Sequence, residues 1–212
     1  MVQTQTKHVP VVPNALVRGG GLVCLVAGVL GAASGVFLSV YPGQVPDDRY
    51  SYPLTAAGFV AIQLWFGVHH LGLLAGIAAL EPADVLGSGR AGRWGVRLGV
   101  AGMALLALAE VLAVTARDKV VGEGTAVLDT LYGVSTTVIG VGLVVAGLAV
   151  RRAGRWTGWR GNVVLVAGVW VFVPMIPALM GPFLAARLAI TGWMLVFAAL
   201  GYALWRSEEV GQ

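Results

Sequence analysis

Long runs of apolar residues alternate with short polar segments along the whole chain. Most of the runs are close to the ~20 residues that a helix needs to cross a bilayer. The six runs cover about residues 22–41, 54–80, 98–116, 125–150, 163–179 and 185–204. The pattern predicts an all-α integral membrane protein, with residues 1–212 forming a single polytopic domain, a bundle of six transmembrane helices.

Two runs admit another interpretation. The fifth run is the shortest, contains Pro174 and Pro177, and is separated from the sixth by only five residues, so a re-entrant hairpin is the alternative to two full spans. The first run resembles a signal peptide in position, but it is longer than a signal-peptide core and follows Pro10 and Pro13. An uncleaved first span is the preferred interpretation.

Composition supports a lipid environment. Hydrophobic residues make up 58% of the chain and charged residues 11%, and the mean hydropathy is +0.83. The lipid bilayer is therefore the first expected partner. The connecting segments are too short for a water-soluble domain, so any activity is expected within the bilayer or at its two faces. Frequent Ala, Val, Gly and Arg are typical of a GC-rich bacterial source, which favours a multi-pass protein of a bacterial plasma membrane.

The placement of the cations predicts the orientation. If the N-terminus lies inside, ten of the 14 Lys and Arg residues fall in inner segments and four in outer ones, because short cytoplasmic loops retain cations. Both termini are therefore expected in the cytoplasm. The cations are spread over several loops and form no dense stripe, so no nucleic-acid partner is predicted. Cys24 is the single cysteine, which excludes an intrachain disulfide and a thiolate metal cluster.

Two carboxylic acids inside the spans are the first candidates for chemistry. An ionisable group on a membrane helix costs about 3 kcal/mol or more in lipid, so it usually faces a protein interior and serves a function. Glu110 and Asp129 lie on consecutive antiparallel runs, roughly 9 Å and 8 Å below the outer end. Two close carboxylates share a proton or need a cation. Arg187, at the outer start of the sixth run, is the best-placed cation.

Other polar residues extend from the acids. Tyr132 and Thr136 follow Asp129 on one helix face, and Gln63 and His70 share a face of the second run, with His69 beside it. The histidines lie about 24 Å from the outer end, so they are expected to reach the acids only through a chain of Tyr132, Gln63, Thr136 and waters. No metal site is predicted, and haem ligation within the chain is disfavoured. For the histidines, a plain structural role at the inner leaflet is the main alternative.

The fifth run adds aromatic residues near its prolines. Trp170 and Phe172 precede Pro174, where the helix is expected to bend at the depth of the acids. Together with Arg187 and the acids, they predict a pocket that opens to the outer side. The alternative is that the prolines shape only helix packing.

Three functions fit this pattern. In the first, Glu110 or Asp129 is a general acid that cyclises or isomerises a lipophilic, terpenoid-like small molecule, bound by Tyr132, Trp170, Phe172, Arg187 and Gln63. In the second, the polar ladder, with Thr136, His69 and His70 as a proton path, serves a proton- or cation-coupled carrier, which at this length is expected to form a homo-oligomer. In the third, the acids only pair with Arg187 or Arg117 and the protein is a non-catalytic accessory subunit. The sequence names no cofactor.

Overall fold

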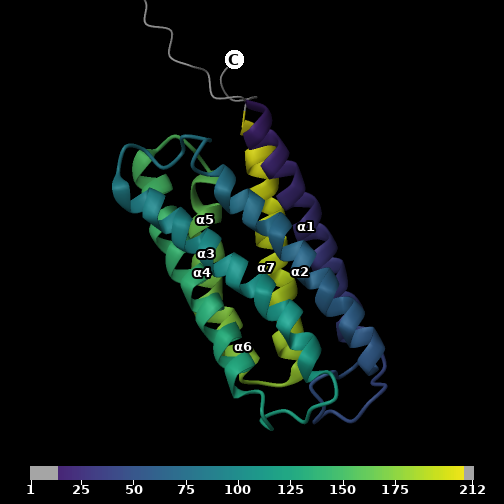
Figure 1. The fold of residues 1–212 in the computed structure, drawn as a ribbon. Helices are drawn as coiled ribbons and strands as arrows, with labels where there is room; N and C mark the ends of the chain where they lie inside the picture. Colours follow the sequence, from purple (N-terminus) through teal and green to yellow (C-terminus); the bar gives the residue numbers. More distant parts are fainter. Residues whose placement is uncertain (1–13, 208–212) are drawn as a thin grey trace, which may run out of the picture.

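The computed structural model describes residues 14–207, which form a bundle of six helical segments of membrane-spanning length (Figure 1). The elements are α1 (Asn14–Val40), α2 (Ala56–Ala79), α3 (Arg90–Ala113), the 3-10 turn η1 (Val114–Ala116), α4 (Ala126–Ala153), α5 (Arg160–Trp170), the π-helical turn η2 (Val171–Met175), α6 (Ile176–Leu179) and α7 (Phe183–Trp205). Within this described range, extended pairing is limited to an isolated bridge between Arg49 and Val120. The predicted all-α bundle with six membrane spans is confirmed.

The boundaries of several spans differ from the predicted ones. α1 begins at Asn14 and α3 at Arg90, each eight residues before the predicted apolar run. Both extensions carry arginines. An arginine ends an apolar run in the sequence, but it does not interrupt the backbone hydrogen bonds of a helix. Long arginine side chains can place their charge at the interface while the backbone stays helical. Hydrophobicity therefore identified the spans but underestimated the length of two helices.

The fifth run is a full span and not a hairpin. Residues Arg160–Leu179 are 20 residues long and continuously helical through α5, η2 and α6. Pro174 lies inside the π-helical turn, where one extra residue accommodates the missing backbone N–H. The prolines therefore change the helix locally without reversing the chain.

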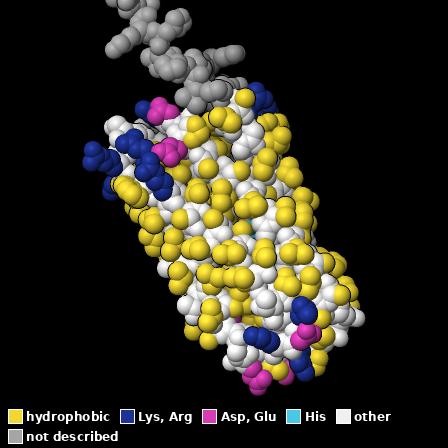
Figure 2. Space-filling model, in the orientation of Figure 1, with side chains coloured by type: hydrophobic (Ala, Val, Ile, Leu, Met, Phe, Trp, Pro, Cys, Tyr) yellow, Lys and Arg dark blue, Asp and Glu magenta, His cyan; other side chains and the backbone are white. Residues whose placement is uncertain are grey.

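The bundle has two distinct ends (Figure 1). We call the end that holds Asn14 and Trp205 the terminal end, and the end that holds residues 41–55 and 117–125 the distal end. Figure 2 shows hydrophobic side chains over the flank of the bundle and charged side chains at its two ends, as a bilayer requires. The cytoplasmic location of the terminal end stays a prediction based on the arginines that gather there.

Close contacts between backbones hold the pairs α1–α7 and α3–α4 together. A Cβ atom on Gly28 of α1 would lie 2.5 Å from the backbone N of Ala198, and one on Gly142 of α4 would lie 2.5 Å from the backbone N of Gly99. Small residues at such crossings increase van der Waals contact between helices, which is the main attraction available in lipid. A core of fully buried apolar side chains fills the terminal half, including Leu73, Ile77, Leu143, Phe197 and Leu200.

Candidate functional site

Glu110 lies at the centre of a buried polar cluster in the distal half. It occupies the last turn of α3 and is only 7% exposed. Its Oε2 accepts hydrogen bonds from the Tyr132 hydroxyl of α4 at 2.7 Å and from Nε2 of Gln63 on α2 at 2.9 Å. Nε2 of Gln63 also lies 3.0 Å from the Tyr132 hydroxyl oxygen. Three helices therefore each supply one polar side chain to a compact triangle inside otherwise apolar surroundings.

His70 faces the other oxygen of the same carboxyl group. Its Nδ1 lies 3.7 Å from Oε1 of Glu110, and its ring centroid lies 4.8 Å from that of His69. Both histidines are buried, and neither ring nitrogen of His69 has a hydrogen-bond partner within normal geometry. The His69 ring fits against α1 where Gly31 has no side chain, because a Cβ there would overlap Nε2. The prediction that the histidines lie out of reach of the acids is wrong for His70.

The stagger of α2 against α3 explains why His70 lies close to Glu110. Gly67 of α2 packs beside Ala107 and Val111 of α3, and Ile77 of α2 packs beside Gly99. These contacts place the first residues of α2 beyond the distal end of α3. Depths counted from the end of each run were therefore not comparable. His70 lies about one helical turn from the level of Glu110, a distance that its side chain can span.

Asp129 has a different environment from Glu110. It is exposed, lies in the first turn of α4, and accepts hydrogen bonds from the Thr125 hydroxyl at 2.7 Å and the Tyr50 hydroxyl at 3.2 Å. Tyr132, one turn along α4, contacts Glu110, so the two acids lie at similar levels as predicted. They do not bind each other directly among the contacts of the described residues. A carboxylate near a helix N-terminus is also stabilised by the helix dipole.

Tyr50 adds a phenol beside Asp129; the sequence predicts its place in the loop above the acids but not this hydrogen bond. Burial, followed by the neighbouring Asp129 carboxylate, raises the pKa of the Tyr50 phenol well above its ordinary value, so the hydroxyl remains a donor. The same phenol lies close enough to Glu110 and Tyr132 to interact with both electrostatically. No periodic pattern marks Tyr50, because it lies in a loop that the apolar runs leave undefined.

Two loops hold Tyr50 in place. The backbone N–H of Tyr50 donates to the carbonyl of Lys119 at 3.0 Å, and that of Val121 donates to the carbonyl of Asp48 at 2.9 Å. Arg49 adds a bond from Nη1 to the carbonyl of Asp118 at 3.1 Å. The loops 41–55 and 117–125 therefore form one layer over the distal end of the bundle.

Arg187 lies beside this cluster without an ion pair. It is half-buried in the second turn of α7, and its guanidinium lies over the Phe183 ring at 4.9 Å from the centroid. It is close enough to Glu110 and Tyr132 for electrostatic interaction. Within residues 14–207, however, no carboxylate lies within ion-pair distance of Arg187, and Arg117 pairs with Asp118 at 3.2 Å. The hypothesis that direct pairing with these arginines fixes the acids is therefore wrong.

The predicted aromatic residues do not gather around the acids. Nε1 of Trp170 donates to the carbonyl of Ala189 at 2.9 Å, and its indole fills the space beside Gly192. The Phe172 ring packs on Gly140 and is 37% exposed. Gly140 lies eight residues beyond Tyr132 on α4, about 12 Å deeper in the bundle. Because α4 and α5 are antiparallel, Pro174 and Pro177 lie nearer to the level of the acids, whereas Trp170 and Phe172 lie deeper in the bundle.

Thr136, the remaining member of the predicted proton path, is half-buried one turn below Tyr132 on α4. The contacts described for residues 14–207 include no hydrogen bond from its hydroxyl to the Glu110 cluster. Glu110 approaches the histidines most closely at Nδ1 of His70, where the 3.7 Å separation is longer than a hydrogen bond and does not involve Thr136.

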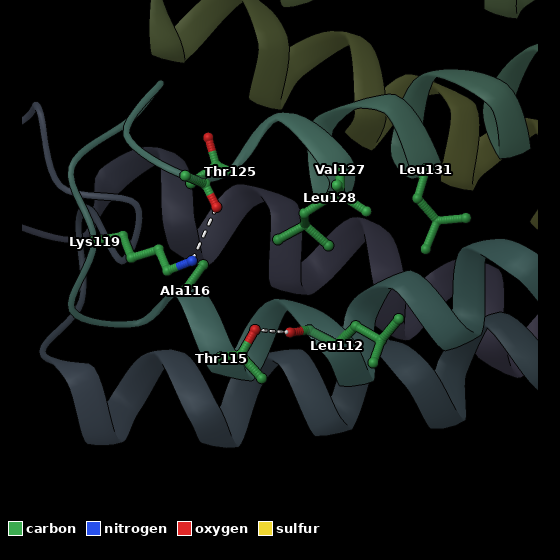
Figure 3. Close-up of a pocket in the computed structure, with 9 residues that line it drawn as sticks. Leu112, Thr115, Ala116, Lys119, Thr125, Val127, Leu128 and Leu131 are labelled. Atoms are coloured by element: carbon green, nitrogen blue, oxygen red, sulfur yellow. Dashed lines mark hydrogen bonds between the residues drawn. The ribbon is translucent and has the colours of Figure 1, made fainter.

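An open pocket of about 260 Å³ lies elsewhere at the distal end, between α3 and α4 (Figure 3). Its lining residues are Leu112, Thr115, Ala116, Lys119, Gly124, Thr125, Val127, Leu128 and Leu131. Leu112 follows Glu110 by two residues, so the two side chains point about 200° apart around α3. This pocket therefore faces away from the buried carboxyl group, and it differs in position from the predicted acidic and aromatic pocket.

The described residues contain no group of three or more His, Cys, Asp or Glu side chains arranged to hold a metal ion. Comparison with known protein families, curated proteins and solved structures finds no match for this chain.

Proposed function

We propose that the protein is a proton-coupled membrane carrier in which Glu110 takes up and releases the coupling proton. The 3.7 Å approach of His70 Nδ1 to Oε1 of Glu110 is the observation that favours this function most, because it sets the carboxyl group beside a buried histidine pair. Titratable side chains that follow one another through the interior of a membrane bundle are typical of proton relays.

Access to Glu110 from one side supports the proposal. Asp129 is exposed at the distal end, Tyr50 donates to it, and Tyr132 links the neighbourhood of Tyr50 to Glu110. On the other side of the histidines, the fully buried apolar side chains of Leu73 and Ile77 separate the cluster from the terminal end. A carrier whose proton site opens to one face of the membrane at a time has the same arrangement, with one side of the site accessible and the other side closed by packed side chains. A second conformation would have to open the terminal half.

The location and assembly of the protein are part of the same proposal. We place it in a bacterial plasma membrane, where a proton gradient is available to drive transport. A chain of six spans is short for a monomeric carrier, so a homo-oligomer is expected.

Infrared difference spectroscopy of the purified protein between acidic and alkaline pH tests the proton site. The carboxylic acid C=O band of Glu110 is expected in the wild type and in Glu123→Gln, which changes an exposed acid of the 117–125 loop. The band is expected to disappear in Glu110→Gln. An unchanged spectrum in Glu110→Gln would contradict proton binding at this residue.

Transport is tested in vesicles that contain the reconstituted protein and a pH-sensitive dye. Amino acids, sugars and carboxylates are added in turn, and one class is expected to cause proton entry that Glu110→Gln lacks. A carrier function is excluded if no solute class moves protons faster than in protein-free vesicles.

Acid catalysis on a lipophilic molecule is a second candidate, and one observation favours it. Glu110 is only 7% exposed, and burial among apolar side chains favours the protonated carboxyl group that a general acid requires. Membranes from cells that produce the wild type and Glu110→Gln are extracted and compared by mass spectrometry. A lipid isomer found only with the wild type would support catalysis, and identical lipid profiles would count against it.

A further inference from the structure

Arg187 is a half-buried cation in a membrane span whose guanidinium has neither a hydrogen bond nor an ion pair among residues 14–207. Three other arginines of the described chain have acids: Arg97 pairs with Glu81, Arg117 with Asp118 and Arg155 with Asp84. An arginine within a span costs about 3 kcal/mol or more unless a partner or water stabilises it. A role in ligand binding would explain why the span keeps an arginine despite this energetic cost.

The surroundings of Arg187 combine the cation with aromatic surface. Its guanidinium lies over the Phe183 ring, and that ring meets the Tyr52 ring edge-on at 5.1 Å. Tyr52 belongs to the loop 41–55 that also carries Tyr50. The guanidinium therefore lies against one ring of an aromatic pair, at the same end of the bundle as Asp129.

Arg187 also lies at the level of the proton site. It interacts electrostatically with Glu110 and Tyr132. Thr191 lies one turn further along α7 and packs on Gly35 of α1. Leu38 lies about one turn beyond Gly35 and belongs to the buried cluster against which Tyr132 packs. The packing of α7 on α1 therefore places Arg187 and the Glu110 cluster in one layer of the bundle.

We propose that Arg187 binds the carboxylate of an organic anion that moves together with the proton on Glu110, an inference that rests on the proposed carrier function. A guanidinium binds a carboxylate through two parallel hydrogen bonds, and Arg187 has its donors free for this pairing among the described contacts. The Phe183 and Tyr52 rings suit an apolar body attached to that carboxylate.

Charge balance couples the two ligands. Without an anion, the positive charge of Arg187 stabilises a nearby Glu110 carboxylate. When an anion neutralises Arg187, the ionised carboxylate loses this stabilisation in a poorly solvated site, and Glu110 takes up a proton. The other titratable groups facing Glu110 are His70 of α2, Tyr132 of α4 and Tyr50 of the loop. If anion binding raises the affinity of Glu110 for a proton by some factor, thermodynamic linkage requires that protonation of Glu110 raise the affinity for the anion by the same factor.

Calorimetry of the purified full-length protein in detergent tests the proposal with acetate, benzoate and octanoate as probes. Titrations in two buffers of different ionisation enthalpy measure the protons taken up. Wild type is expected to take up about one proton for each carboxylate bound, as a single coupled site requires. Benzamide, which resembles benzoate but has no charge, is expected not to bind.

Three variants separate the roles. Arg187→Gln is expected to weaken carboxylate binding at least about tenfold, which corresponds to roughly 1.4 kcal/mol. Arg187→Lys, which keeps the charge but not the planar fork, should give an intermediate affinity and thereby separate recognition from folding. Glu110→Gln should still bind carboxylate but without proton uptake. Arg117→Gln, at the already paired arginine of the distal loop, is the matched control and should behave as wild type.

Carboxylate binding that survives in Arg187→Gln, or that proceeds without proton uptake in the wild type, would overturn the inference. So would the failure of all three carboxylates to bind. If Glu110 still shows its infrared band and a different solute class drives protons into vesicles, the carrier proposal survives while the carboxylate proposal fails.

Discussion

The terminal and distal halves of this bundle are held together by different contacts. In the terminal half, glycines bring helix backbones together and fully buried aliphatic side chains such as Leu143 and Leu200 fill the core. In the distal half, Glu110, Gln63 and Tyr132 form hydrogen bonds across α3, α2 and α4. Close backbone packing is therefore most evident in the terminal half, whereas the buried carboxyl and histidine side chains lie in the distal half.

This difference indicates a division between stability and chemistry. Van der Waals contact between close helices is the reliable source of stability in lipid, whereas a polar group gains little net energy from each hydrogen bond. The polar cluster contains a carboxyl group, which can bind or release a proton, whereas the aliphatic core cannot. Substitutions in the two halves should therefore differ in size and in kind.

The largest effect is expected from an added methyl group in the glycine contacts. Gly142→Ala places a Cβ 2.5 Å from the backbone N of Gly99 and 2.7 Å from the carbonyl oxygen of Gly95, so α3 and α4 must separate. The free energy of unfolding should fall by about 1–3 kcal/mol, as for other overpacked cores. Unfolding by SDS, followed by circular dichroism, measures the change.

Gly133→Ala on the same helix is the matched control. A Cβ at Gly133 meets no atom within 4 Å, so alanine should be neutral or should stabilise α4 by up to about 1 kcal/mol through helix propensity. Equal effects of the two substitutions would contradict the importance of the α3–α4 contact.

A smaller effect is expected when the same hydroxyl group is removed from each half. Tyr132→Phe deletes the 2.7 Å bond to Glu110 and should lower the free energy of unfolding by about 1–2 kcal/mol. Tyr202→Phe, on α7 near the terminal end, removes a hydroxyl with no hydrogen bond among the described residues and should stay within about 0.5 kcal/mol of wild type. A Tyr132→Phe protein as stable as Tyr202→Phe would show that the polar cluster contributes nothing to stability.

The smallest effect is expected at the distal surface. Tyr50→Phe removes the 3.2 Å hydrogen bond to Asp129 and should cost about 0.5–1 kcal/mol at neutral pH. The folded protein raises the pKa of Tyr50 above the unfolded value of about 10, so folding favours the protonated phenol. Its contribution is present below about pH 10 and is lost as the pH rises further.

Unfolding measured between pH 7 and pH 11 checks this pH dependence. The stability difference between wild type and Tyr50→Phe should shrink as the phenol of the wild type is forced to ionise. A difference that grows above pH 10 would have the wrong sign for this explanation.

Much of the fold could be predicted from the apolar pattern, but the candidate site only in part. The number of spans follows from hydrophobic length, and Glu110, Gln63 and Tyr132 were recognisable because polar residues on a membrane helix need a protein partner. The contact of His70 with Glu110 was missed because sequence gives no stagger between neighbouring helices. Trp170 and Phe172 were assigned too near the acids because the register of α4 and α5 depends on how Gly147 packs on Leu165 and Gly140 on Phe172.

The sequence by itself determined that this chain is a six-span helical membrane protein and that its spans carry two acids, because burial of the backbone and of charge in lipid is governed by local composition. Only the tertiary structure decided which acid is buried, which histidine contacts it and where Arg187 lies. These relations depend on the axial shift and rotation of one helix against another. Glycine contacts between distant segments set both quantities, and no single run of the sequence contains them.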